Sequence, residues 1–227
     1  MTQEPFGFLL FDIDGTLLTA GGAGRKSIEE AVTAVISAPW DSSSIRLHGN
    51  TDRSVFQEIS QVLPESLQCV KTMDTLINHY FQRLDFNLVN SNCAMLYPGV
   101  FELLEQIHAI WNISLLTGNF RKSAFIKLRA CGIDHFFEDG GFADDGFSRT
   151  DILASYIKKR SIPPGKAILI GDTPWDAQAA LNCGIKSIGV SNGRFSIGEL
   201  SDSGFNLVFE TMMDLSVKLI EELLSND

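Results

Sequence analysis

The chain has 227 residues, of which 44% are hydrophobic and 20% charged, and its formal net charge is -10. This composition predicts a folded globular protein, because disordered chains contain few large apolar residues. The acidic balance excludes a surface built for nucleic acid, which requires an excess of Lys and Arg.

The first predicted element is a strand over residues 6–11, and an acidic segment follows it at once. Five of these six residues are large and apolar, which is typical of a strand buried on both faces of a parallel sheet. Asp12 and Asp14 come next, and open α/β sheets bind ligands at the carboxyl ends of their strands. Because two neighbouring buried acids need a cation or a proton to offset their charge, the pair predicts a divalent metal site with one Asp free for chemistry.

The next part of the chain is predicted to be helical. A glycine-rich stretch at 20–24 suits a hinge, and apolar residues recur at helical spacing over 25–37, 51–63 and 72–88. No strand followed by a crossover is expected here. We therefore expect a helical cap domain over 16–95, inserted into a core made of 1–15 and 96–227.

Strands and helices alternate from residue 97 onward, which predicts right-handed crossovers and an α/β fold with a Rossmann-like, doubly wound parallel sheet. The expected strands are 112–116, 167–170, 185–190 and 206–209. The expected helices are 99–110, 121–131, 150–160, 174–182 and 211–224.

Polar side chains follow two of these later strands. Thr117, Gly118 and Asn119 end the strand at 112–116, while Asp172 and Asp176 follow the strand at 167–170. In a parallel sheet these groups meet Asp12 and Asp14 at one edge, where carboxylate oxygens suit Mg²⁺. Thr117 and free backbone N–H groups suit an anion. A metal beside an anion site, with a spare carboxylate nucleophile, fits phosphoryl transfer through an aspartyl-phosphate.

Here the sequence resembles the haloacid dehalogenase superfamily, and within it the phosphoglycolate-phosphatase-like members with a helical cap. The resemblance rests on Asp-Ile-Asp-Gly-Thr at 12–16, Leu-Leu-Thr-Gly-Asn at 115–119 and Gly-Asp-Thr-Pro-Trp-Asp at 171–176. Each motif alone is short, but their order, spacing and strand context are specific.

The resemblance implies a role for each matching residue. Asp12 attacks phosphorus, and Asp14 protonates the leaving oxygen and then activates water. Thr117 and the backbone at Gly118 hold phosphoryl oxygens, with Asn119 beside them. The implied Mg²⁺ ligands are Asp12, the backbone carbonyl of Asp14, Asp172 and Asp176. The second Asp of the first motif favours phosphoester over carbon–halogen chemistry.

The sequence departs from the family at the third motif, which supplies a Lys before the last motif. Arg149 stands at that place, whereas Lys122 and Lys127 come too early in the chain and Lys158 and Lys159 too late. Arg keeps the charge and binds phosphate bidentately, but it is larger and planar. Our hypothesis is that Arg149 replaces the Lys and that the site stays active.

In the cap, Arg25, Thr51 and Asp52 are candidates for substrate binding. Similar cap phosphatases often carry a Gly-x-Thr-Asp segment facing the active site, as at 49–52. A capping turn for the helix that begins near Asp52 is an equally good interpretation.

These features predict a Mg²⁺-dependent phosphatase for a small phosphorylated metabolite. The alternatives are a phosphomutase of the same superfamily and a phosphate-binding or regulatory protein with weakened turnover. We expect a cytoplasmic protein, because no apolar run reaches a membrane span and the N-terminal segment lacks the basic start of a signal peptide. The four cysteines form no CxxC motif, which favours structural thiols in a reducing compartment. A monomer or homodimer is expected. The sequence does not identify the substrate.

Overall fold

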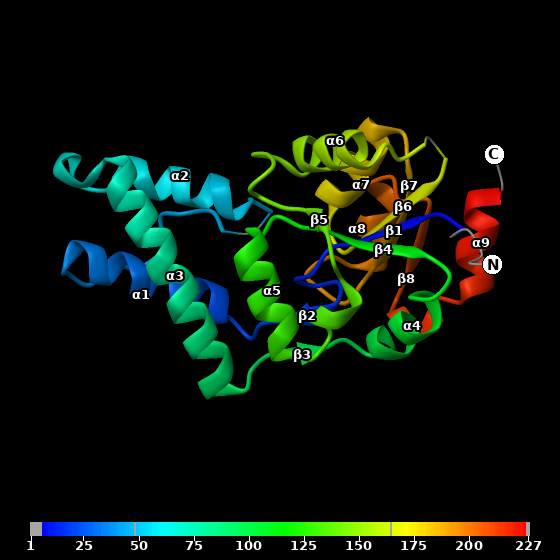
Figure 1. Cartoon of the computed structure of the whole chain (residues 1–227), viewed down its shortest axis with the longest axis horizontal. Coiled ribbons are helices and arrows are strands. Elements are labelled where there is room, and N and C mark those ends of the chain that lie inside the picture. The colour runs from blue at the N-terminus through cyan, green and yellow to red at the C-terminus, as the bar shows by residue number, and fades with distance from the viewer. Residues whose placement is uncertain (1–5, 48, 164, 226–227) are drawn as a thin grey trace.

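The computed structural model describes residues 6–47, 49–163 and 165–225, and a six-stranded parallel sheet forms its centre (Figure 1). The strands lie in the order β5-β4-β1-β6-β7-β8. Their bounds are β1 Phe8–Phe11, β4 Asn112–Leu116, β5 Gly140–Gly141, β6 Ala167–Gly171, β7 Lys186–Val190 and β8 Leu207–Phe209. β1 therefore lies between β4 and β6, and the expected doubly wound sheet is confirmed.

Side chains of β1 alternate between two hydrophobic layers. Leu9 and Phe11 are buried in a cluster with α4 (Val100–Ile107), α5 (Arg121–Ala130) and α9 (Val217–Ser225). Leu10 is buried on the opposite face with α6 (Arg149–Arg160) and α7 (Pro174–Cys183). Each such burial stabilises the fold by roughly 1.5–3 kcal/mol. The first strand is thus covered on both faces, as its apolar run predicts, and it fixes the residues that follow it.

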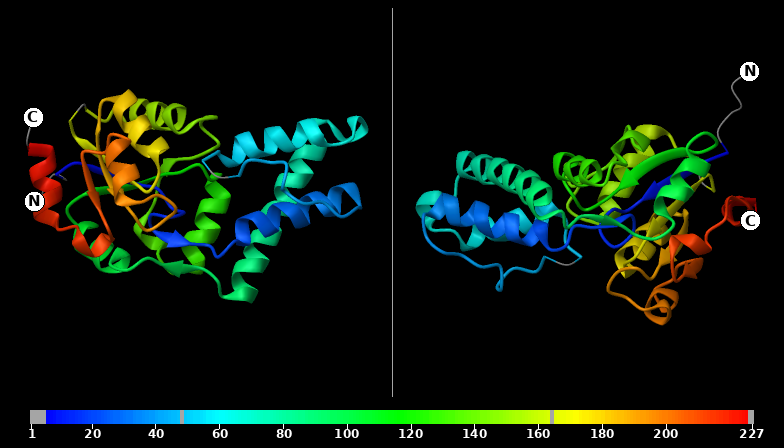
Figure 2. Two further views of the ribbon diagram at one scale, coloured as in Figure 1. Left: turned by 180° about the vertical axis from the view of Figure 1, so that it is seen from behind. Right: turned by 90° about the horizontal axis from the view of Figure 1, so that it is seen from below.

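Three helices form a separate layer beyond the sheet: α1 (Ala23–Ile36), α2 (Asp52–Val62) and α3 (Val70–Ser91). Figures 1 and 2 show them to one side of the sheet, on the side opposite α9. α1 packs against α3, and α3 also packs against α5. The division into a cap over 16–95 and a core over 1–15 and 96–227 stays a prediction, although these helices fall within the expected cap.

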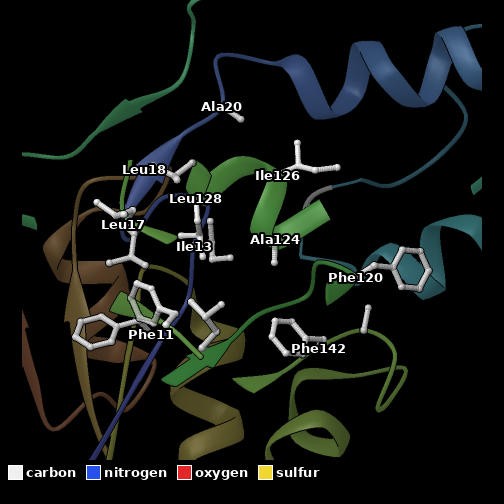
Figure 3. Packing of buried hydrophobic residues seen from close by; sticks show 14 of the residues in the cluster. Phe11, Ile13, Leu17, Leu18, Ala20, Phe120, Ala124, Ile126, Leu128 and Phe142 are labelled. Carbon is white, nitrogen blue, oxygen red and sulfur yellow. The ribbon is translucent and has the colours of Figure 1, made fainter. Parts of the chain in front are cut away.

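A two-stranded antiparallel ribbon marks the place where the chain leaves the six-stranded sheet for these helices and where it returns. β2 (Leu18–Thr19) pairs with β3 (Met95–Leu96), with Leu18 opposite Leu96. Helix α5 packs close by, because its Ala124 and Leu128 lie in one buried cluster with Leu18 and with Ile13 from the loop after β1 (Figure 3). The acidic loop after β1 is therefore held between the sheet and α5.

Several elements differ from the sequence-based expectation, and the strands β2 and β3 described above are among them. β5 consists of two glycines, which carry no hydrophobic pattern, and α8 (Ile197–Asp202) is a six-residue helix begun by a capping box at Ser196. The helix predicted over 211–224 is split into a short 3₁₀ turn at Met212–Asp214 and α9. Among the helices of the described residues, none combines the length and apolarity that crossing a membrane requires.

Candidate active site

The carboxyl ends of β1 and β6 bring three buried acids together. Asp12 follows β1, Asp172 follows β6, and Asp176 lies in the first turn of α7, whose capping box joins Thr173 to Asp176. Asp12 is 1% exposed and Asp176 is fully buried. One carboxylate oxygen from each of the three lies within 4.8 Å of the others. The sequence predicted this meeting from strand order alone.

Arg149 extends into this acidic cluster from the start of α6. A capping box between Ser148 and Asp151 begins the helix, so that Arg149 is its first residue. Its Nη1 and Nη2 lie 2.8 and 2.9 Å from the two carboxylate oxygens of Asp12, and Nη1 also lies 2.9 Å from Asp176 Oδ1. Burial opposes the charge of the guanidinium, but the carboxylates of Asp12 and Asp176 raise its pKa. Arg149, which we expected to replace the third-motif Lys, thus contacts Asp12 directly.

The negative charge of the three acids exceeds what Arg149 neutralises. Burial and the charges of Asp12 and Asp176 raise the pKa of Asp172 well above its ordinary value. Burial likewise raises the pKa of Asp176 to about 6, although Arg149 and hydrogen bonds from Thr173 counteract this effect. Asp12 Oδ1 and Asp176 Oδ1 are both buried, and they share one cationic partner, Arg149 Nη1, at 2.8 and 2.9 Å. Hard oxygen donors with uncompensated charge fit Mg²⁺, and Asp12, Asp172 and Asp176 are the residues that would hold it.

Gly15 allows Asp172 to approach the first motif. Its φ is +89°, and a Cβ atom at this position would lie 2.1 Å from Asp172 Oδ2. Thr16 then donates a hydrogen bond from its Oγ1 to Asp172 Oδ1 over 3.1 Å. The glycine is therefore required both by the turn and by the packing of the carboxylate against it.

Asp14 lies on the other side of the loop and its side chain is 43% exposed. Burial would raise its pKa, but Lys127 and Asn119 together hold that pKa below its ordinary value. Asn119 Nδ2 donates to Asp14 Oδ2 and to Thr117 Oγ1, each over 2.8 Å. Because the Thr117 hydroxyl accepts in this contact, its hydrogen stays available for a phosphoryl oxygen.

Lys127 is the site residue that the sequence argument set aside, because it precedes the expected third motif. It is 5% exposed, and its Nζ lies 2.5 Å from Asp14 Oδ2. The available signal was its position in α5: Ser123, Ala124, Lys127 and Leu128 all fall on the buried stripe of that helix. A lysine on such a stripe requires a buried anionic or polar partner.

A cavity of about 390 Å³ opens between the sheet edge and the helical layer. Asp14, Gly118, Asn119, Lys127, Arg149 and Asp172 line its sheet side. Arg25, Asp52 and Tyr80 line its helical side, and Arg25 donates to Ser42 Oγ over 2.6 Å. The cavity is therefore bounded by both parts of the structure.

The neighbouring cap candidates Thr51 and Asp52 differ in their placement. Thr51 does not line the cavity; its hydroxyl donates to the Phe147 carbonyl over 3.0 Å and caps α2. Asp52 lines the cavity, but its Oδ2 accepts from the Phe120 N–H over 2.9 Å and from Ser123 Oγ over 2.7 Å. Both residues therefore join α2 to the sheet domain, and the capping interpretation holds for Thr51.

Residues 9–190 match the sequence profile of the haloacid dehalogenase-like hydrolases. The chain belongs to this family. The phosphoglycolate phosphatases of Vibrio parahaemolyticus and Colwellia psychrerythraea are 27% and 26% identical to it, over 95% and 93% of this chain and 96% of each relative. The expected family, with its phosphoglycolate-phosphatase-like character, is confirmed, as is the expected class of phosphoric monoester hydrolases.

Solved structures of haloacid dehalogenase-like proteins share the fold. A predicted phosphoglycolate phosphatase from Haemophilus somnus is 22% identical with a TM-score of 0.72, over 95% of this chain and 98% of that one. CbbY from Rhodobacter sphaeroides, solved in complex with phosphate, is 17% identical with a TM-score of 0.74, over 93% of this chain and 96% of that one. At these identities the likeness concerns the fold.

Proposed function

We propose that this hydrolase is a Mg²⁺-dependent phosphatase that acts on a small phosphorylated metabolite through an aspartyl-phosphate on Asp12. The environment of Asp12 carries the proposal. The carboxylate is buried, both of its oxygens contact Arg149, and two further acids lie beside it. Such a cluster suits the transfer of a phosphoryl group, where negative charge must be held in a fixed place.

In the first step the Asp12 carboxylate attacks phosphorus, and the bond between phosphorus and the leaving oxygen breaks. Arg149 lies against both oxygens of Asp12, so its positive charge stands next to the group that is transferred. A guanidinium binds phosphoryl oxygens bidentately. Arg149 therefore supplies the charge that the family obtains from its third-motif Lys.

Asp14 is positioned for the proton transfers. It faces the cavity with part of its side chain exposed. Lys127 and Asn119 occupy its Oδ2 and make the protonated carboxyl a stronger acid, so that in the first step Oδ1 carries the proton that passes to the leaving oxygen. In the second step the Asp14 carboxylate takes a proton from the water that attacks the phosphorus of the aspartyl-phosphate. Phosphate leaves, and Asp12 and Asp14 regain their initial states.

The metal has a defined place in this proposal. Asp12, Asp172 and Asp176 would hold Mg²⁺, with the backbone carbonyl of Asp14 as the fourth ligand that the family implies. When bound, the ion neutralises negative charge on the transferring phosphoryl group.

The cavity supports a small substrate. Its volume of about 390 Å³ suits a compact metabolite, and Gly118 and Arg25 are the residues that we propose to hold it from opposite sides. Because relatives of similar length include phosphoglycolate phosphatases, phosphoglycolate is the first compound to test. The cytoplasmic location and the monomeric or homodimeric state stay predictions.

The test is the release of inorganic phosphate from a panel of small phosphate monoesters, with Mg²⁺ or with EDTA. Asp12→Asn removes the nucleophile and is expected to abolish release. Asp202→Asn, at an exposed acid of α8, is the matched control and keeps the wild-type rate. If Asp12→Asn released phosphate as fast as the wild type, the proposed mechanism would be refuted. Conversion of a sugar phosphate to its isomer without release would point to a phosphomutase instead.

A further inference from the structure

Lys127 is a buried cation whose role the family resemblance does not assign. It is 5% exposed, and its Nζ contacts Asp14 Oδ2 at 2.5 Å and Asn119 Oδ1 at 2.6 Å. A buried ammonium group is costly unless it is paired and hydrogen-bonded. Both contacts are with residues that line the sheet side of the cavity. The free-energy cost of burying the ammonium group is therefore offset by residues of the candidate active site.

Asp14 is held asymmetrically by these contacts. Its Oδ2 accepts from Lys127 Nζ and from Asn119 Nδ2. Among the described residues, no hydrogen bond reaches its Oδ1. One oxygen is therefore fixed by two donors, while the other is left to face a substrate. Asn119 is fixed in turn, because it bonds Lys127 through its oxygen and Thr117 through its nitrogen.

Helix α5 keeps Lys127 in place. Ala124 and Leu128, on the same face of the helix, are fully buried beside Ile13 and Leu18 (Figure 3). At the beginning of the helix, the Asp52 carboxylate accepts from the Phe120 N–H and from Ser123 Oγ. The Lys127 ammonium group is thus held by a helix that is packed and hydrogen-bonded on its buried side, whereas the side chain of Asp14 is partly exposed to the cavity.

We infer that Lys127 is a positioning residue for Asp14: it fixes the carboxylate so that its free oxygen meets the leaving oxygen of the phosphoester. The inference rests on the proposed phosphatase activity. When the phosphorus–oxygen bond breaks, its electron pair goes to the leaving oxygen, which takes the proton from Asp14. An alkyl leaving group needs this proton, because an alkoxide is a poor leaving group. A p-nitrophenolate leaves without it.

The two kinds of ester therefore separate positioning of Asp14 from general damage to the fold. Lys127→Met keeps the length of the side chain and removes the ammonium group. We expect kcat/KM for a small alkyl phosphate to fall about 10²–10³-fold, within the range of general acid catalysis, and that for p-nitrophenyl phosphate to fall less than about 10-fold. Arg129→Met, which removes an exposed cation from the same helix, is the control and should change neither value.

A double variant completes the test. In an Asp14→Asn background, Lys127→Met should cause little further loss with the alkyl ester, because the group that it positions is gone. Equal losses with both esters would overturn the inference and assign Lys127 a structural role only, and an undiminished rate with the alkyl ester would overturn it as well. A wild-type protein that hydrolyses neither ester would instead overturn the proposed function, and the inference with it. Activity toward p-nitrophenyl phosphate also reports that the Lys127→Met variant is folded.

Discussion

Replacing Arg149 by Met tests the electrostatic reading of the acidic cluster. Arg149 contacts both oxygens of Asp12 and Oδ1 of Asp176 at 2.8–2.9 Å. Without it, three carboxylates within 4.8 Å of one another would be buried with no cation beside them. Breaking a buried ion pair by removing one partner costs about 3–5 kcal/mol. We therefore expect Arg149→Met to lower the free energy of unfolding by about that amount at pH 7 in EDTA.

Two conditions should reduce this loss. At pH 5, Asp172 and Asp176 can take up protons, because burial and neighbouring charge raise their pKa values, so that less unpaired charge is buried. At pH 7, added Mg²⁺ should restore part of the stability, because a ligand that binds only the folded state stabilises it. Phosphatase activity should stay at least about 10²-fold below that of the wild type in both conditions.

Urea denaturation at the two pH values, with EDTA or Mg²⁺, is the assay. Lys218→Met is the control, because it breaks an exposed ion pair with Glu222, where Lys218 is 83% exposed, and such pairs contribute about 0–1 kcal/mol. If Arg149→Met were as stable as the wild type at pH 7 in EDTA, the three acids would not be charged as we infer. Unchanged activity would show that Arg149 does not replace the third-motif Lys.

Three further outcomes are expected. For the wild type in EDTA, the free energy of unfolding should fall as the pH rises from about 4 to 6, because the pKa of Asp176 is raised from 3.8 to about 6 in the folded protein. Each unit of this pKa difference corresponds to about 1.4 kcal/mol. Thermal unfolding at a series of pH values measures the change, and a rise in stability between pH 4 and 6 would contradict the prediction. Gly15→Ala should lower Mg²⁺ affinity and activity at least about 10²-fold, because its Cβ would lie 2.1 Å from Asp172 Oδ2. Gly198→Ala, at an exposed glycine of α8 whose added Cβ meets nothing within 4 Å, should leave both unchanged in titration and phosphate-release assays. Asp52→Ala should raise KM or lower kcat about 10-fold, because it removes two hydrogen bonds between α2 and α5, and steady-state kinetics identical to those of the wild type would show that these bonds do not matter for turnover.

The sequence was sufficient to predict the parts of the fold and site that depend on a local pattern, such as an apolar strand followed by polar residues. The apolar run before Asp12, and the polar groups that end two later strands, placed the acids at one edge of a parallel sheet. Arg149 was predicted from the family resemblance, which places a cation at the start of the helix before the last motif.

Lys127 could not be predicted in this way. The buried stripe of α5 marks Lys127 as a buried cation, but its partner Asp14 lies 113 positions away in the chain, and no local pattern identifies that partner. The two-glycine strand β5 has no pattern at all, and its pairing is set by its neighbour β4.

The β2–β3 ribbon has a consequence for how this chain can be built. Thr19 and Met95 are paired. The segment between them therefore begins and ends on adjacent strands of one ribbon. No strand of the six-stranded sheet comes from that segment. A short loop joining Thr19 to Met95 would therefore leave every hydrogen bond of the sheet in place, and the helices that enclose the cavity can be exchanged as one module while the acidic cluster beneath them is kept.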